Sequence, residues 1–382
     1  MSSVKQKQCI MIISGEASGD IHGSKLVKSM RRKNKNLFFC GIGGSALKKE
    51  GVRILFEAEK ISVVGMTEVI PKLISILKGL ILTKRILKSL RPDLLILIDF
   101  PDFNINVAAT AKKLNIPVLY YISPQIWAWR SGRVKKIKKR VDHVAVILPF
   151  EEKYYKKHNV PVTFVGHPLL DKTNVYNSKD KIMKVGDTPV IGLVPGSRDG
   201  EVTRHLPIML DTASIIQERI KKAKFNISVA PTVKEELVED ILKENKQIQN
   251  VKIVTGSIDT FLRKCVFVIA VSGTVTLETA ISGVPMLIIY KMSWLSYVVA
   301  RLLIKGVKYV GLVNLVAGKS LVPEMLQSEA EPEKIADKVL EMMKNKNKID
   351  KLKNDLLDVR KKLGDAGASD RVAEIAIHMM RF

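Results

Sequence analysis

The sequence predicts an α/β protein made of two Rossmann-like, doubly wound parallel-sheet domains. In both halves short apolar runs alternate with amphipathic helical stretches, and this alternation is typical of parallel strands joined by right-handed crossovers. A polar stretch over 171–187 has little apolar periodicity and interrupts the pattern. We therefore expect a first domain over 1–170, a linker over 171–187 and a second domain over 188–345. The helical, lysine-rich 346–382 is expected to pack across them, on the first domain or on a partner protomer of a homodimer.

The strands expected in the first half are short and apolar, and they lie at 9–13, 37–40, 52–56, 94–98, 118–122, 143–148 and 161–165. Those expected in the second half lie at 190–194, 225–230, 251–255, 266–271 and 286–290. Between strands, the segment 70–81 places its apolar residues on one helical face. Such a stripe usually packs on a core, but Lys84, Arg85 and Lys88 flank it and keep contact with a membrane surface open.

The composition limits the classes of protein to which this chain can belong. The chain has 382 residues, of which 63 are basic and 38 acidic, and its net charge of +25 favours an anionic partner such as nucleic acid, a membrane surface or a phosphorylated substrate. Cys9, Cys40 and Cys265 lie in or beside apolar runs without CxxC spacing, as expected of reduced cysteines in a cytosolic protein. We expect no signal peptide, and no apolar run reaches the roughly 18 residues of a membrane-spanning helix.

The stretch LLILIDFPDFN, at 94–104, places two carboxylates directly after a buried strand. In parallel sheets ligands bind beyond the carboxyl ends of the strands. A carboxylate that is partly removed from water gains proton affinity, which suits it to taking a proton from an alcohol. Asp102 is also placed to cap the following helix, so both interpretations stay open for it. Asp99 lies too early in the turn to be a cap.

The turn GEASGD follows the first expected strand and opens the first helix. Its glycines permit a tight turn and close approach of a ligand to the backbone. Glu16 and Asp20 would repel a pyrophosphate, so the turn favours contact with hydroxyls such as those of a sugar. A structural turn in which Asp20 is a helix cap is the alternative. The candidate ligand-binding residues of this turn are Gly15, Ser18, Gly19 and Asp20.

Two further glycine turns lie in the second half. PGSR follows a strand and offers a guanidinium, the group best shaped for bidentate recognition of phosphate. SGTVTLE begins a helix with backbone N–H groups and hydroxyls, and its glutamate, one turn into the helix, can bind the two hydroxyls of a ribose. The candidate residues for binding phosphate and ribose in these turns are Gly196, Ser197, Arg198, Ser272, Gly273, Thr274 and Glu278.

The loop SPQIWAW contains two of the three tryptophans of the chain, and a basic helical segment follows it. Trp127 and Trp129 are two residues apart, so in an extended loop both face the same way. Aromatic residues beside a basic helix can stack on bases, lie at a membrane interface or pack as a corner of the core. The residues alone leave these three alternatives open.

Taken together, the motifs resemble a known family. GEASGD, IDFPDFN, SPQIWAWR, LPFE with GHP, PGSR followed by Glu201, SGTVTLE and VNLVAGKSLVPEMLQ occur in the order found in lipid-A-disaccharide synthases. The resemblance implies the GT-B type of architecture, in which two Rossmann-like domains face a central cleft, and catalysis without a metal or other cofactor. It also implies inverting transfer from UDP-2,3-diacylglucosamine to 2,3-diacylglucosamine 1-phosphate, giving a β-1,6-linked disaccharide 1-phosphate and UDP.

The same resemblance implies roles for individual residues. Asp99 matches the general base that deprotonates the acceptor 6-hydroxyl, and Glu16 matches an acidic residue needed for activity. Arg198 and Asn314 match residues of the UDP site, and Glu278 is similar to the ribose ligand of related folds. Asp102, Trp127 and Trp129 are further candidates for the acceptor side.

Both implied substrates carry acyl chains and phosphate, which the apolar helices and the basic residues are suited to bind. We therefore expect a cytoplasmic protein attached peripherally to the inner membrane through 70–81 and 127–140. Another UDP-sugar transferase or an epimerase of the same architecture is the alternative, although the tryptophan loop is not expected in one. A nucleic-acid-binding protein would explain the charge and little else, so no nucleic-acid partner is expected.

Overall fold

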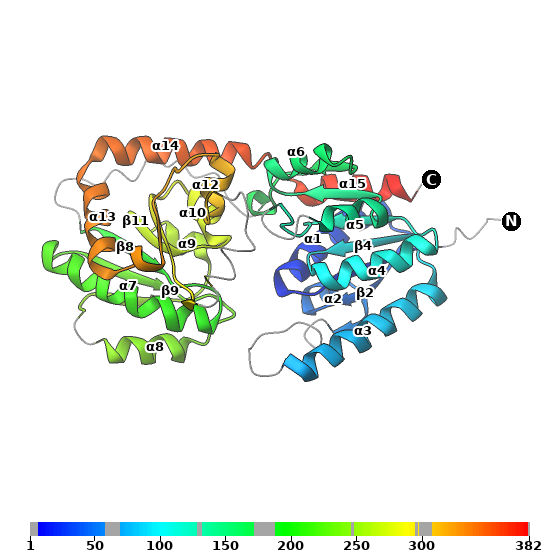
Figure 1. Cartoon of the computed structure of the whole chain (residues 1–382), viewed down its shortest axis with the longest axis horizontal. Helices are drawn as coiled ribbons and strands as arrows, with labels where there is room; N and C mark the ends of the chain where they lie inside the picture. Colours follow the sequence, from blue (N-terminus) through cyan, green and yellow to red (C-terminus); the bar gives the residue numbers. More distant parts are fainter. Residues whose placement is uncertain are drawn as a thin grey trace. The chain divides into compact units, whose positions relative to one another are not determined.

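The computed structural model describes residues 7–57, 69–127, 132–171, 188–245, 248–294, 297 and 308–380, and for 69–74 it describes the backbone alone. The chain divides into two compact units (Figure 1). The first unit comprises Met1–Asp171 with Gly364–Phe382, and the second comprises Lys172–Leu363. Each unit is an α/β unit around a parallel sheet, which confirms the predicted fold class.

Parallel strands form the seven-stranded sheet of the first unit, in the order β3-β2-β1-β4-β5-β6-β7. They are β1 (Gln8–Ser14), β2 (Leu37–Gly43), β3 (Arg53–Glu57), β4 (Leu94–Ile98), β5 (Val118–Tyr121), β6 (His143–Val146) and β7 (Val162–Phe164). The strand order reverses between β1 and β4. At such a point the connections leave the sheet in opposite directions and open a crevice for a ligand.

Helices cover both faces of this sheet: α1 (Ala17–Lys33), α2 (Ser45–Lys49), α3 (Val69–Leu90), α4 (Pro101–Lys113), α5 (Arg133–Arg140), α6 (Pro149–Lys157), α15 (Ala368–Met379) and the short η2 (Pro168–Asp171). Successive strand residues alternate between two cores. Met11 and Leu95 face the core under α3, α4 and α5, whereas Ile10 and Leu94 face the core under α1 and α15. Burial on both faces explains why these strands are continuous apolar runs.

A six-stranded parallel sheet forms the second unit, in the order β10-β9-β8-β11-β12-β13. Its strands are β8 (Val190–Val194), β9 (Lys224–Ser228), β10 (Val251–Val254), β11 (Phe267–Val271), β12 (Met286–Tyr290) and β13 (Glu324–Leu326). The described helices are α7 (Asp199–Arg219), α8 (Glu235–Glu244), α9 (Ile258–Leu262), α10 (Val275–Ile281), α12 (Leu312–Ala317), α13 (Pro332–Lys344), α14 (Lys346–Lys362) and η4 (Gln327–Glu329). The sequence analysis missed β13, because three half-buried residues form no apolar run.

The C-terminal segment, which we expected to pack across the domains, is divided between the two units. Helix α14 packs against α10 and α12 of the second unit, whereas α15 packs along α1 of the first. Gly364 and Gly367, with φ of 84° and 93°, provide the left-handed backbone between the two helices. Asp370 of α15 accepts hydrogen bonds from the buried Ser29 and from Arg32 of α1. The last helix is therefore part of the first unit.

Candidate functional site

The turns that carry the expected catalytic residues leave neighbouring strands at the point where the strand order reverses. Glu16 follows β1 and Asp99 follows β4, and these two strands pair along their length. The second unit repeats this arrangement, because PGSR follows β8, SGTVTLE follows β11 and these strands also pair. Each unit therefore places its candidate residues where doubly wound sheets bind ligands.

Asp99 lies in a turn with unusual backbone geometry. Asp99 and Phe100 both have φ of 49°, and a left-handed residue other than glycine costs about 1–2 kcal/mol. Side chains donate three of the hydrogen bonds that hold the turn. The buried Asn104 donates its Nδ2 to the carbonyl oxygens of Ile98 (3.2 Å) and Asp99 (2.7 Å), and the buried Tyr120 donates its hydroxyl to the Asp99 carbonyl at 2.8 Å. The backbone of Asp99 is thus fixed before any substrate arrives.

The carboxyl group of Asp99 has the proton affinity of a general base. Burial, together with a smaller effect of the negative charge of Glu16, raises the pKa of Asp99 to about 6, against the backbone N–H of Phe100, which favours the ionised form. At neutral pH the group is ionised yet holds a proton more tightly than an ordinary aspartate, as proton transfer from an alcohol requires. The negative charge of Glu16 therefore acts on the carboxyl group of Asp99.

Gly15 lets the turn after β1 pack closely against the turn after β4. A Cβ atom at Gly15 would lie 2.3 Å from Cγ of Phe100, so the aromatic ring occupies the space that a side chain would need. The Phe100 ring also stacks on Phe103, with 5.0 Å between centroids. Gly15 is thus a packing requirement, and through Phe100 it fixes the spacing between the turns that carry Glu16 and Asp99.

Two other carboxylates of the first unit have structural partners. Asp20 is buried, and its oxygens accept N–H bonds from Gly44 (2.6 Å), Ala46 (2.8 Å) and Leu47 (3.4 Å), which caps α2. Asp20 thus acts as a helix cap, as in the alternative given above, and its contact with a hydroxyl stays a prediction. Asp102 pairs with Arg133 and so ties the start of α4 to α5. Ser18 is exposed and Gly19 is buried.

The tryptophan loop is anchored by a carboxylate that the sequence analysis did not single out. Glu151, in the first turn of α6, accepts hydrogen bonds from the indole Nε1 of Trp127 and from the backbone N–H of Leu148, both at 3.2 Å. The Trp127 ring also meets Phe150 edge to face at 4.7 Å. Burial raises the pKa of Glu151 to about 7. Trp129 lies outside the described residues.

Replacing Glu151 by glutamine should change how the stability of the first unit depends on pH. The folded-state pKa of Glu151 is about 7 against 4.5 when exposed, so its contribution is fully present below pH 4.5 and is lost as pH rises to 7. The wild type should therefore lose up to about 3 kcal/mol of unfolding free energy between these limits, and Glu151→Gln should not.

Urea unfolding at pH 5 and pH 7.5, followed by tryptophan fluorescence, measures this difference. A Trp294→Phe background leaves Trp127 and Trp129 as the reporters, and both lie in the first unit. Glu239→Gln, at an exposed position of α8 in the second unit, is the matched control. An equal pH dependence in wild type and Glu151→Gln would show that Glu151 is not the buried titrating group.

The PGSR turn of the second unit presents an arginine at the start of α7. Gly196 has φ of 128°, and Glu201 fills the space beside it. The Glu201 carboxylate accepts the N–H of Ser197 at 2.9 Å and contacts the Arg198 guanidinium at 3.3 Å. Thr232 donates its hydroxyl to the Ser197 carbonyl at 2.6 Å. The turn is held rigidly, while the Arg198 side chain remains 67% exposed to meet an anion.

The turn after β11 combines a fixed hydroxyl with open backbone. Ser272 donates its hydroxyl to the Val310 carbonyl at 2.9 Å, and so connects this turn to the segment before α12. Apart from its chain neighbours, no atom of the described residues lies within 4 Å of a Cβ placed on Gly273, which leaves space beside the backbone there. Thr274 is the N-cap residue of α10, and Glu278 lies half-buried in its first turn.

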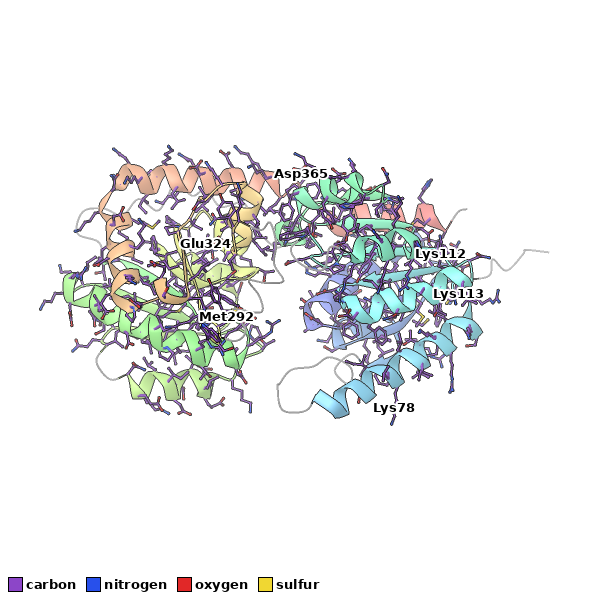
Figure 2. All side chains as sticks on the ribbon, in the orientation of Figure 1. Lys78, Lys112, Lys113, Met292, Glu324 and Asp365 are labelled. Carbon is purple, nitrogen blue, oxygen red and sulfur yellow. The ribbon has the colours of Figure 1, made fainter. Side chains whose placement is uncertain are left out.

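Asn314 holds the loop around α12 from a buried position. Its side chain is fully buried: Nδ2 donates to the Val322 carbonyl and to Glu324, and Oδ1 accepts the N–H groups of Leu321 and Val322. Glu324 (Figure 2) also accepts the N–H groups at 310 and 311. Asn314 therefore fixes the loop around α12, and its match to the UDP site stays a prediction. Glu324 was missed as a site residue, although it lies within the motif that ends the resemblance.

The sequence relationship to known proteins identifies the family of this chain. The family model described as lipid-A-disaccharide synthetase matches residues 10–378. The chain belongs to this family. It is 43% identical over 376 residues to a lipid-A-disaccharide synthase of Syntrophus aciditrophicus, covering 97% of this chain and 98% of that protein. The corresponding synthase of Geobacter metallireducens is 42% identical over 375 residues, covering 97% of each. Membership makes this chain an enzyme, a glycosyltransferase of lipid A biosynthesis.

Solved structures share the architecture at low sequence identity. A putative UDP-N-acetylglucosamine 2-epimerase from Listeria monocytogenes superposes with a TM-score of 0.66 at 14% identity, covering 98% of each chain. MurG from Acinetobacter baumannii superposes with a TM-score of 0.58 at 15% identity, covering 97% of this chain and 99% of that one. At these identities the likeness establishes the fold, which these transferases and epimerases share with members of the lipid-A-disaccharide synthetase family.

Proposed function

We propose that the chain transfers 2,3-diacylglucosamine from its UDP derivative to the 6-hydroxyl of 2,3-diacylglucosamine 1-phosphate, with inversion at the anomeric carbon. The observation that carries the proposal is Asp99: a carboxylate on a fixed backbone turn at the reversal point of the first sheet, with a pKa of about 6. Asp99 accepts the hydroxyl proton as the acceptor oxygen bonds to the anomeric carbon. The bond from that carbon to the UDP oxygen breaks, and UDP leaves with the electron pair.

The second unit is suited to stabilise the leaving UDP. Arg198 and the backbone of the PGSR turn can offset the developing negative charge on the diphosphate, and an oriented guanidinium in a rigid turn needs little reorganisation to do so. Glu278 is proposed to bind the ribose hydroxyls. The proposed mechanism requires no metal ion. Within the described residues, no cluster of three or more histidine, cysteine or acidic side chains could hold one.

An assay of the purified protein with both proposed substrates, in the presence of EDTA, tests the proposal. We expect equimolar disaccharide 1-phosphate and UDP. Epimerised UDP-sugar formed without acceptor would support the alternative suggested by the epimerases of the same fold. Activity that needs an added divalent cation would contradict the metal-free mechanism.

We further propose that the first unit attaches to the cytoplasmic face of the inner membrane. Among the described residues, no helix is both long and apolar enough to cross a bilayer. Leu77, Ile81 and Leu82 of α3 are nevertheless 49%, 53% and 39% exposed, and Lys78 lies on the outer side of the same helix (Figure 2). Exposed lysines of α5 lie over the same sheet face. Apolar side chains flanked by cations suit the interface of an anionic bilayer.

Substituting Leu77 and Ile81 together by serine should weaken binding to vesicles containing anionic lipid by about tenfold or more, since each side chain loses its apolar burial. Vesicle sedimentation measures the partitioning. Ile21→Ser is the matched control, because Ile21 is 42% exposed on α1, over the opposite face of the sheet. Equal loss in the control, or no loss in the double variant, would rule out α3 as the contact surface.

A further inference from the structure

A continuous series of hydrogen bonds joins the exits of β8, β12 and β13, and a buried histidine lies at its centre. His205, in the second turn of α7, is 1% exposed. Its Nδ1 lies 2.7 Å from the carbonyl oxygen of Glu201, and its Nε2 accepts the backbone N–H of Lys291 at 3.0 Å. The ring also stacks on Tyr290, with centroids 5.7 Å apart. The mechanism proposed above makes no use of this residue.

Both ends of the series lie at the carboxyl ends of strands of the second sheet, where parallel sheets bind ligands. At one end the Glu201 carboxylate holds Ser197 and Arg198 of the PGSR turn. At the other end Met292 (Figure 2) is held by Gln327, whose Oε1 accepts the Met292 N–H at 2.8 Å and whose Nε2 donates to the Met292 carbonyl at 3.2 Å. The segment 291–292 therefore has both of its N–H groups bound to side chains from other elements.

The bonds around His205 require one protonation state. Because the Lys291 N–H donates to Nε2, that nitrogen carries no proton, and Nδ1 must carry the proton that it donates to Glu201. Burial lowers the pKa of His205, with a smaller effect of the Arg204 charge, against the Glu201 and Lys291 contacts. The neutral imidazole with its proton on Nδ1 is therefore the form that satisfies both partners.

We propose that His205 is a positioning residue of the donor site, which fixes the backbone after β12 at a set distance from the PGSR turn. The inference rests on the proposed donor site. The carboxyl ends of neighbouring parallel strands form the walls of a ligand site, and a wall held before binding costs less conformational entropy when the ligand arrives. His205 supplies that restraint between β8 and β12, and Gln327 extends it to β13.

Two substitutions separate the contacts of His205. His205→Gln can place an acceptor near the position of Nε2 and so keep the bond to Lys291, whereas the shorter His205→Asn reaches only as far as Nδ1 and loses it. Thr212→Val is the matched control, because Thr212 is also buried on α7 but its hydroxyl bonds only to the Ile208 carbonyl of the same helix. We expect the Kd for UDP to rise about tenfold in His205→Asn, the equivalent of one lost hydrogen bond, and to stay within about twofold of wild type in the other two.

Two further measurements distinguish positioning from general destabilisation. The KM for the UDP-sugar should rise in His205→Asn while the KM for the lipid acceptor stays unchanged. Backbone amide exchange at 291 and 292, measured without ligand, should accelerate in His205→Asn and not in His205→Gln. Unchanged exchange, or equal effects of Thr212→Val on UDP binding, would overturn the inference. Failure of the wild type to bind UDP would overturn the proposed donor site instead, and the exchange result would still report on the restraint.

Discussion

Asp99→Asn should reduce kcat for disaccharide formation about a thousandfold while leaving the KM for the UDP-sugar nearly unchanged. Asparagine preserves the shape of the side chain, and the hydrogen bonds that fix this turn go to the Asp99 carbonyl, which the substitution keeps. The change therefore removes the proton acceptor alone, and loss of a positioned general base typically costs between about a hundredfold and ten-thousandfold.

The pH profile gives the same hypothesis a second test. The base must be ionised, so kcat/KM of the wild type should fall about tenfold per pH unit as pH drops below the Asp99 pKa of about 6. The Glu16 charge contributes to that raised pKa. Glu16→Gln should therefore move the acid limb of the profile to lower pH, whatever activity it retains.

Asp102→Asn is the control for these experiments. Asp102 lies three residues further along the same motif, but its carboxylate is 75% exposed and pairs with Arg133. We expect it to retain most of its activity with an unshifted acid limb. If Asp102→Asn lost activity as severely as Asp99→Asn, or if Asp99→Asn stayed active, the base would have to be assigned elsewhere.

The strands and the positions of the candidate turns could be predicted because their causes are local. Asp99 follows a run of five apolar residues, and a run of that kind in an alternating α/β pattern can only be a strand buried on both faces. The place of Asp99 at the carboxyl end of that strand follows directly. PGSR after β8 was predictable for the same reason.

What the residues do with their hydrogen bonds could not be predicted in the same way, because the partners are distant in the chain. Asp20 caps a helix that begins 25 residues later, at Ser45. Tyr120 reaches the Asp99 turn from the neighbouring strand. Glu151 and Glu324 each gather donors from loops, and no periodicity marks such residues. A motif shows that a side chain matters, but only tertiary contacts show whether it binds a ligand or holds a loop.

Gly15→Ala should cause the second large effect, a loss of activity of about a hundredfold with about 1–3 kcal/mol of destabilisation. The added Cβ would lie 2.3, 2.5 and 2.8 Å from Cγ, Cδ1 and Cβ of Phe100. The ring cannot simply turn away, since it stacks on Phe103 and its backbone is held in the turn that Asn104 fixes. The displacement must therefore reach Asp99, and about 1 Å of misplacement is enough for such a loss.

A second substitution shows whether the clash is the cause. In the Gly15→Ala background, Phe100→Ala removes the obstructing ring, so the double variant should regain most of the activity that Gly15→Ala loses. Gly132→Ala is the control, because among the described residues, chain neighbours aside, no atom lies within 4 Å of a Cβ at that position, and it should behave as wild type. A double variant no more active than Gly15→Ala would mean that the glycine is needed for its own backbone, close to the substrate. Recovery would show that its role is to let Phe100 set the distance between Glu16 and the base.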